Sequence, residues 1–212
     1  MEHIPPRAFF PRGEGLQLKT IPSCNEHNNQ KSKDDQYVLA HICINASLGE
    51  NQAKAIFKRS IASHLKRSRA FREILVAGSE TSNDGKRRYK VDMSRFDNFF
   101  NHLAAGLFFD RYGKQLNHST HRVGHEYLDF YDGVLNGKLK TGCIQSIVKK
   151  LFSEFKDKVV EYEADKIDEV VYAYRIMETY GPDSSITIYH TFYGVFNVIT
   201  FLTRDHNFQV KN

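Results

Sequence analysis

Two short segments near the start of the chain carry residue types that hydrolytic and metal chemistry needs. The first is Glu2-His3, and the second is Cys24-x-x-His27, which Asn28 follows at once. An imidazole titrates near neutral pH and can take a proton from water. Carboxylate and amide oxygens are the ligands that hard divalent cations such as Mg²⁺ prefer. The Cys-x-x-His spacing is that of one half of a structural zinc site, which needs four ligands.

Each of these features also has a common structural explanation. A Glu-His pair near a chain end is usually a solvated loop, and Asn28-Asn29 is usually a turn or a helix cap. The order and spacing of the whole set favour a functional interpretation. That set also includes Pro5, Phe10, the approach Ile21-Pro22-Ser23-Cys24 and the run from Asn28 to Asp35.

Taken together, these segments resemble the HNH, or ββα-metal, nuclease family. In that family an acidic residue and a histidine end the first strand, and an Asn or His opens a helix after a second strand. Glu2 and His3 match the first pair, and Asn28 matches the helix-opening ligand. The resemblance implies that His3 activates water and that Lys31 offers charge near the phosphate. It also implies that Glu2 and Asn28 hold a Mg²⁺ or Mn²⁺ ion, loosely when substrate is absent.

The chain departs from the family pattern in two places. The middle Asn of the family name is not evident, because Lys19 stands near its expected position. Many members also hold their fold with a second Cys-x-x-Cys upstream of the acidic-His pair, and here only Cys24 and His27 are present. We therefore expect Zn²⁺ only in a form extended upstream by such a pair, and weak or no cleavage without it. A non-catalytic nucleic-acid-binding protein derived from an HNH nuclease is the alternative.

A run of positive charge follows the motif. Between residues 54 and 72 the chain has seven Lys or Arg and no Asp or Glu: Lys54, Lys58, Arg59, Lys66, Arg67, Arg69 and Arg72. Such a run suits a phosphate backbone, although a solvated helix face explains it equally well. The expected partner is nucleic acid, with DNA as the expected substrate, and nothing in the sequence indicates contacts that distinguish bases.

The bulk composition sets broader limits. The 212 residues carry a formal charge of +5 and a pI near 9.0, and 41% are hydrophobic, so an ordinary core is expected. Three cysteines without framework spacing and no long apolar stretch predict a cytoplasmic protein that does not cross a membrane. Cys43 is expected to be a buried core thiol, and Cys143 has no evident base. His118, His121 and His125 are expected in a solvated loop.

Periodicity and turn residues predict the elements that must position these groups. Helices are expected over 33–46, with Ser32 as N-cap, over 51–65, 69–76, 94–112 and 144–155. Strands are expected over 16–21, 86–91, 126–130, 169–177, 185–192 and 195–202, with a polar loop over 79–85. We predict an α+β protein in which residues 1–48 form a partial ββα-metal module. Residues 49–212 then form a helical region and a C-terminal antiparallel sheet, without a chemistry that the residue types reveal.

Overall fold

The computed structural model describes residues 1–11, 19–23, 25–46, 52–81, 83, 85, 87–88, 90–128, 171–178, 185–194 and 196–204, without the side chains of 25–30, 45–46 and 87–88. Helices and strands are mixed and a four-stranded antiparallel sheet lies at the C-terminal end, which confirms the α+β class. The chain forms two compact units, Met1–Phe99 and Phe100–Asn212, whereas the sequence motif placed a boundary after residue 48. Within the described ranges, no helix combines the length and apolarity needed to cross a membrane.

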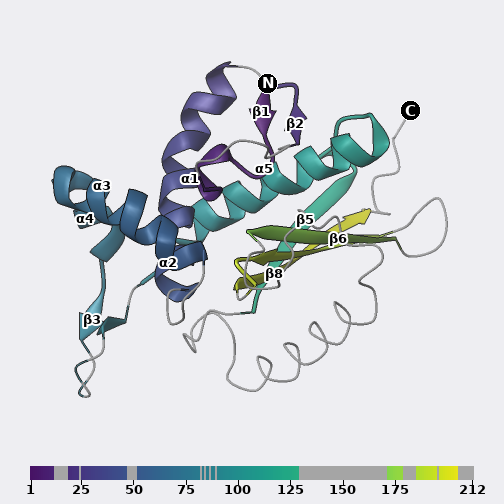
Figure 1. Ribbon diagram of the computed structural model, residues 1–212. Coiled ribbons are helices and arrows are strands. Elements are labelled where there is room, and N and C mark those ends of the chain that lie inside the picture. Colours follow the sequence, from purple (N-terminus) through teal and green to yellow (C-terminus); the bar gives the residue numbers. More distant parts are fainter. Residues whose placement is uncertain are drawn as a thin grey trace. The chain divides into compact units, whose positions relative to one another are not determined.

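Unit 1 begins with a small ββα arrangement (Figure 1). Strand β1 (Glu2–His3) pairs antiparallel with β2 (Thr20–Ile21), and the short helix η1 (Arg7–Phe9) lies between them in the chain. The Ile4 amide donates to the Lys19 carbonyl at 3.0 Å and extends the pairing by one step. Of the strand expected over 16–21, the described part is confined to β2, and residues 12–18 lie outside the described ranges.

Helix α1 (Asn25–Ala46) corrects the sequence prediction. It begins at Asn25 rather than at Lys33, so Ser32 is not its N-cap, and Asp34 and Asp35 lie in its interior rather than in its first turn. Residues 25–32 contain neither proline nor glycine, so nothing in this segment blocks the helix. The longer helix places Lys31 one turn before Asp35.

Aromatic side chains form the core of unit 1. Helix α1 buries Tyr37, whose ring meets Phe96 edge-on at 6.2 Å, and Phe9 stacks on Phe99 at 5.2 Å. The Tyr37 hydroxyl accepts a hydrogen bond from the Asp92 amide at 2.8 Å, which satisfies its polar end. Cys43 is fully buried, as predicted.

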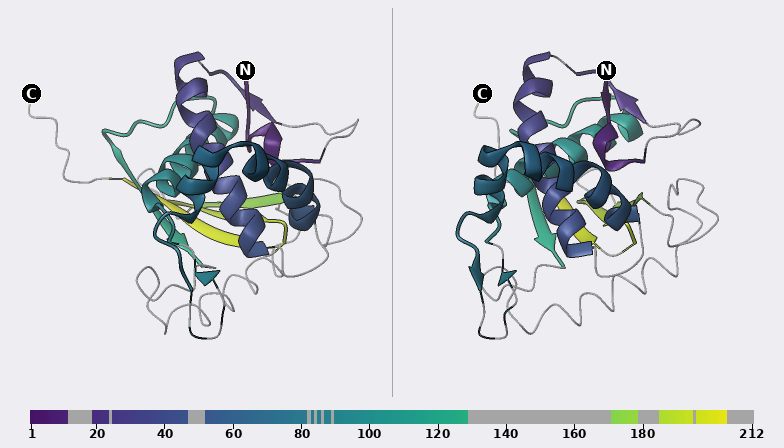
Figure 2. Two further views of the ribbon diagram at one scale, coloured as in Figure 1. Left: turned by 90° about the vertical axis from the view of Figure 1, so that its left-hand side faces the viewer. Right: turned by 60° about the vertical axis from the view of Figure 1, so that its left-hand side comes forward.

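The helix expected over 51–65 is divided into three pieces: α2 (Gln52–Ile56), the π-helical turn η2 (Phe57–Ile61) and α3 (Ala62–Arg67). Ser68 is extended and ends α3, and its hydroxyl accepts from the Phe71 amide at 3.2 Å, which caps α4 (Arg69–Val76). The strands β3 (Glu80–Thr81) and β4 (Arg87–Arg88) then pair, visible below the helices in Figure 2. The expected polar loop over 79–85 therefore contains a strand, and β4 is the part of the strand expected over 86–91 that the described residues show.

The sheet of unit 2 consists of β5 (His121–Tyr127), β6 (Tyr172–Glu178), β7 (Ile186–Phe192) and β8 (Phe196–Arg204) in the order β5-β8-β7-β6. The predicted meander of the last three strands is confirmed, and Tyr193 and Gly194 turn between β7 and β8 with φ of 54° and 70°. The first strand begins before the predicted 126–130, so His121 and His125 lie on a strand rather than in a loop.

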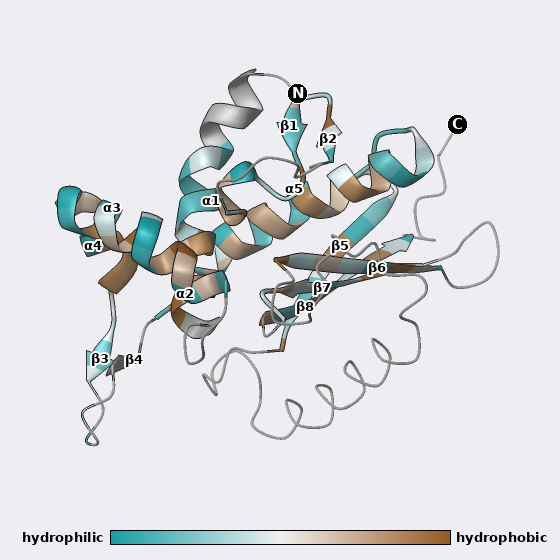
Figure 3. Ribbon diagram, viewed as in Figure 1, coloured by the Kyte–Doolittle hydropathy of each residue, from teal (hydrophilic) through white to brown (hydrophobic). Residues whose placement is uncertain are grey.

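Helix α5 (Met93–Tyr112) passes from unit 1 into unit 2. It ends as predicted at Gly113, which has φ of 67° and donates to the Phe109 carbonyl at 2.8 Å. In unit 2 its Phe100 ring contacts Tyr127 and Phe192 of the sheet. The brown stretches along α5 in Figure 3 are this apolar surface. The predicted helix over 144–155 and Cys143 lie outside the described residues.

Candidate active site

The β1–β2 pair places Glu2 and His3 beside helix α1. Glu2 is opposite Ile21 and His3 is opposite Thr20 in the antiparallel register. The loop that follows is anchored because Ile4 is buried and the Arg7 guanidinium donates to the Pro11 carbonyl at 2.9 Å. The expected acidic-His pair therefore lies on an ordered strand, not in a solvated loop.

Lys31 joins α1 to this strand. Its ammonium donates to Glu2 Oε1 in an ion pair and lies 3.9 Å from Asp35 Oδ1, one helical turn away. The Lys31 side chain is only 4% exposed, and those of Glu2 and Asp35 are 14% and 15% exposed. Two largely enclosed carboxylates therefore converge on one buried cation, in an environment where unpaired charge is costly. We call Glu2, Lys31 and Asp35 the acidic–lysine cluster.

Asp35 has a pKa near neutrality. Burial raises the pKa of its carboxyl from 3.8 to about 7, the Lys31 ammonium opposes that rise, and the Glu2 and Asp34 carboxylates add to it. Asp35 Oδ1 is also buried and has no hydrogen-bond partner among the described residues. Strongly perturbed buried carboxyls concentrate at functional sites, so Asp35 becomes a candidate.

His3 has an unused ring nitrogen. Its Nδ1 atom is buried and, in the part of the chain that the structure describes, has no hydrogen-bond partner. An unsatisfied buried polar atom costs roughly 1–3 kcal/mol, so such an arrangement calls for a partner that arrives with a ligand or with water. One nitrogen of the expected base therefore has no hydrogen-bond partner among the described residues.

The remaining predicted ligands are only partly placed. The backbone of His27 and Asn28 lies in the first turns of α1, three or four residues before Lys31, but their side chains and all of Cys24 lie outside the described residues. The predicted ligation by these three residues is therefore untested. Asp35, in contrast, was missed, because a helix starting at Lys33 made it a first-turn carboxylate. Its i,i+4 spacing from Lys31 was the available signal.

The carboxylates of the acidic–lysine cluster can be compared with the ligands that a divalent cation requires. The described residues contain no group of three or more His, Cys, Asp or Glu placed to bind a metal. Mg²⁺ needs fewer protein ligands, since one or two carboxylates together with water and phosphate oxygens complete its shell. Glu2 and Asp35 already converge on a positive charge, the Lys31 ammonium. Glu2 and Asp35 are therefore the two carboxylates that such an ion could use, and in the structure the Lys31 ammonium lies between them.

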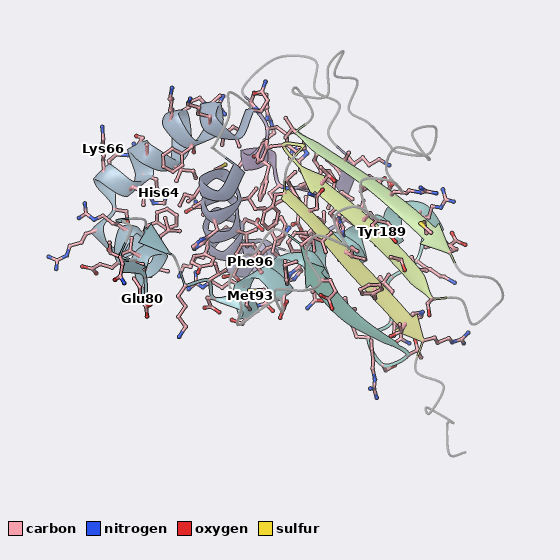
Figure 4. The ribbon with its side chains drawn as sticks, turned by 90° about the horizontal axis from the view of Figure 1, so that it is seen from below. His64, Lys66, Glu80, Met93, Phe96 and Tyr189 are labelled. Carbon is pink, nitrogen blue, oxygen red and sulfur yellow. The ribbon has the colours of Figure 1, made fainter. Side chains whose placement is uncertain are left out.

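The predicted cationic residues lie on α2, η2, α3 and α4 in the same unit. Six are exposed and Lys54 is half-buried; the exposed ones are Lys58, Arg59, Lys66, Arg67, Arg69 and Arg72. We call these seven residues the basic helices' surface. The Arg59 guanidinium donates to the Phe10 carbonyl at 3.4 Å and so ties η2 to the loop after β1. Stacking of His64 on Phe71 at 4.3 Å fixes α3 against α4, and Figure 4 shows Lys66 pointing away from them.

Comparison with known proteins adds no independent assignment to this geometry. The arguments for function are therefore the ββα order, the acidic–lysine cluster and the basic helices' surface, all within unit 1. No protein-family model, curated protein or solved structure matches the chain.

Proposed function

We propose that unit 1 is a metal-dependent endonuclease that hydrolyses phosphodiester bonds of nucleic acid, with DNA as the expected substrate. The observation that carries the proposal is the convergence of Glu2 and Asp35 on Lys31, beside the strand that holds His3. This is the ββα order that the HNH resemblance predicts. The basic helices' surface supports it with a matching charge for a polyanion on the same unit.

Each residue has a distinct part in the proposed reaction. His3 accepts a proton from water through its free Nδ1, the water oxygen forms the new bond to phosphorus, and the ester bond to the leaving oxygen breaks. Glu2 and Asp35, with Asn28 by resemblance, hold Mg²⁺ or Mn²⁺. The bound ion supplies the charge that stabilises the scissile phosphate and the leaving oxygen. Lys31, released from Glu2, faces the phosphate as a second positive charge.

The raised pKa of Asp35 fits this division of roles. Without an added cation, the cluster holds one ammonium, and a proton on Asp35 relieves the repulsion between two buried carboxylates. A divalent cation replaces that proton. Cation binding is then expected to release a proton and to strengthen as pH rises through about 7.

Cleavage is tested with supercoiled plasmid. The 212-residue protein with Mg²⁺ or Mn²⁺ should convert plasmid to the nicked form, and chelation should stop the conversion. His3→Ala should lower the rate by about 10²- to 10⁴-fold, because it removes the general base. The matched control is His118→Ala, which removes an exposed histidine of unit 2 and should cleave as the wild type does. Equal nicking by the wild type and His3→Ala would refute the assignment.

A second function, nucleic-acid binding without cleavage, is favoured by one observation. Lys31 already neutralises Glu2, so the cluster is charge-balanced by the chain's own cation. In that case plasmid would be bound with Mg²⁺ present but not nicked. Binding and nicking measured on the same samples separate the two functions.

The basic helices' surface has a test of its own. Reversing Arg67, Arg69 and Arg72 to Glu should weaken duplex binding and lower the slope of log affinity against log salt by about 0.9 for each phosphate that the protein no longer neutralises. Arg69 also pairs with Glu73 at 2.6 Å, so its share is expected to be the smallest. Titrations at several salt concentrations, with Lys114→Glu in the loop after α5 as control, measure the slope. An unchanged slope would remove this surface from the proposal.

A further inference from the structure

A line of hydrogen bonds crosses the whole sheet of unit 2, with one side chain on each strand. Tyr172 on β6 meets His190 Nδ1 on β7 at 2.9 Å, and His190 Nε2 meets Thr200 Oγ1 on β8 at 3.1 Å. Thr200 Oγ1 then meets His125 Nδ1 on β5 at 2.9 Å, and His125 Nε2 meets Asn101 Oδ1 on α5 at 3.0 Å. We call these five residues the polar stripe.

The strand register explains why these side chains share one face. His125 is directly opposite Thr200, and Thr200 is opposite Ile188, two residues from His190. His190 is in turn opposite Tyr174, two residues from Tyr172. Side chains two residues apart on a strand point to the same side. The stripe therefore runs diagonally over the face that Asn101 of α5 contacts.

While both imidazoles are neutral, the Asn101 end fixes the direction of every hydrogen bond. The Asn101 Oδ1 atom is an acceptor only, so the single ring hydrogen of neutral His125 lies on Nε2, and its Nδ1 accepts from the Thr200 hydroxyl. Thr200 has a single hydrogen and therefore accepts from His190 Nε2. His190 then accepts at Nδ1 from the Tyr172 hydroxyl. All four hydrogens point from β6 towards α5, and both imidazoles are neutral.

The stripe is enclosed by apolar rings. His190 and Thr200 have no exposed surface and Tyr172 is 1% exposed. Phe100 contacts the rings of His125 and His190 at 5.9 and 5.4 Å, and Phe192 lies 4.7 Å from Tyr172. Burial, with His125 next in effect, lowers the pKa of His190 to about 3, so this ring does not hold a proton charge near neutral pH. It can pass a proton on, however, because it has one donor and one acceptor nitrogen.

We propose that the polar stripe is a proton relay whose charge resides on His125 and whose protonation reverses the tautomer of His190. Uptake of one solvent proton at the Tyr172 oxygen moves three hydrogens by one bond each: from Tyr172 to His190 Nδ1, from His190 Nε2 to Thr200, and from Thr200 to His125 Nδ1. His125 becomes an imidazolium held by Asn101. His190 stays neutral but now carries its hydrogen on Nδ1, and Tyr172 accepts instead of donating.

The groups around the stripe favour a charge at the His125 end. The titratable rings that contact it among the described residues are those of Tyr127 on β5 and Tyr174 on β6. From α5 the facing group is the uncharged amide of Asn101. His125 is half-buried, whereas His190 is fully buried, so the charge is less costly on His125. The relay lies in unit 2 and is independent of the proposed nuclease site.

The relay is tested by nitrogen-15 NMR of the histidine rings in the full 212-residue protein. At pH 7.5 both His125 and His190 should be the Nε2–H tautomer. As the pH is lowered until the His125 signals titrate, His190 should change to the neutral Nδ1–H tautomer with the same midpoint. His190 remaining Nε2–H throughout would mean that both rings donate to Thr200 and would overturn the relay. An Nδ1–H form of His190 at pH 7.5, or unfolding before His125 titrates, would overturn it as well.

Variants test whether the change at His190 reaches it from His125 through Thr200. Thr200→Val removes the central hydroxyl, so His125 should still titrate while His190 no longer follows it. Thr203→Val, an exposed threonine on the same strand, should behave as the wild type does. If Thr200→Val does not fold, Tyr172→Phe serves instead. It removes the hydroxyl that supplies the proton to His190 Nδ1, so His190 should stay Nε2–H while His125 titrates, and a change of His190 to Nδ1–H would contradict the relay.

Discussion

Replacing Asp35 with Asn is expected to stabilise the protein at pH 8 while lowering its nicking activity. The folded state holds this carboxyl with a pKa of about 7 instead of 3.8, so ionising it within the fold is costly. The stability that a proton on Asp35 supports is fully present below pH 3.8 and is lost as pH rises through about 7. At pH 8 the variant avoids this cost, which amounts to at most about 4 kcal/mol.

Chemical denaturation at pH 4 and pH 8 measures the effect. The variant and the wild type should differ little at pH 4 and clearly at pH 8, and nicking at pH 8 should fall by at least about 10-fold. Asp34→Asn is the control, because it removes a neighbouring carboxylate that lies 3.7 Å from Arg95 instead of in the cluster. A variant that is less stable at pH 8, or that nicks normally, would exclude a functional Asp35. Stability gained at the expense of activity is the usual sign of a group retained for function.

The last three strands of unit 2 and their order in a meander follow from local sequence patterns. Alternation in Ile186–Phe192 and Phe196–Arg204, with Tyr193-Gly194 between them, predicts a hairpin because the turn residues and the period of two agree. The alternation of residue types does not show which strand pairs with β5. His121–Tyr127 pairs with β8, which is distant in the chain, and that pairing depends on long-range packing rather than on local preference.

Only part of the candidate site could be predicted from the sequence, because the rest depends on how the chain folds. Glu2, His3 and Lys31 were identified from motif order, and the structure brings Glu2 and Lys31 into an ion pair. Asp35 was missed because Asn and Ser are good N-caps, so Ser32 indicated a helix start. A burial-dependent pKa cannot be deduced from residue types, since burial is a property of the folded chain.

The polar stripe also could not be predicted from the sequence, because its residues are far apart in the chain. His118, His121 and His125 form a local group in the sequence, yet the structure connects His125 to His190 and Tyr172 through Thr200. These residues lie on four strands, and only the antiparallel register aligns them. His121 instead hydrogen-bonds locally, with its Nδ1 3.0 Å from Thr120 Oγ1. Proximity in sequence was therefore a poor guide to which histidines act together.

Acidification is expected to destabilise unit 2 through His190. Its pKa is lowered from 6.5 to about 3 in the folded state, because the buried ring cannot carry charge. Below pH 6.5 the unfolded state therefore binds a proton that the folded state does not bind, and the free energy of unfolding decreases by about 1.4 kcal/mol per pH unit until about pH 3. Between pH 6.5 and pH 4.5 this amounts to a loss of about 2 kcal/mol, on the order of a fifth of a typical domain's stability.

Hydrogen exchange of the β7 amides measures this loss in unit 2 alone. That choice matters because His41 in unit 1, with a pKa lowered to about 4 by burial, gives the whole protein a second acid-sensitive group. His190→Gln should remove the pH dependence of β7 protection between pH 6.5 and 4.5, although its protection at pH 7 should be lower than that of the wild type. His118→Gln, an exposed histidine in the same unit, should leave the dependence intact. Equal slopes in the wild type and His190→Gln would mean that another group senses the acid.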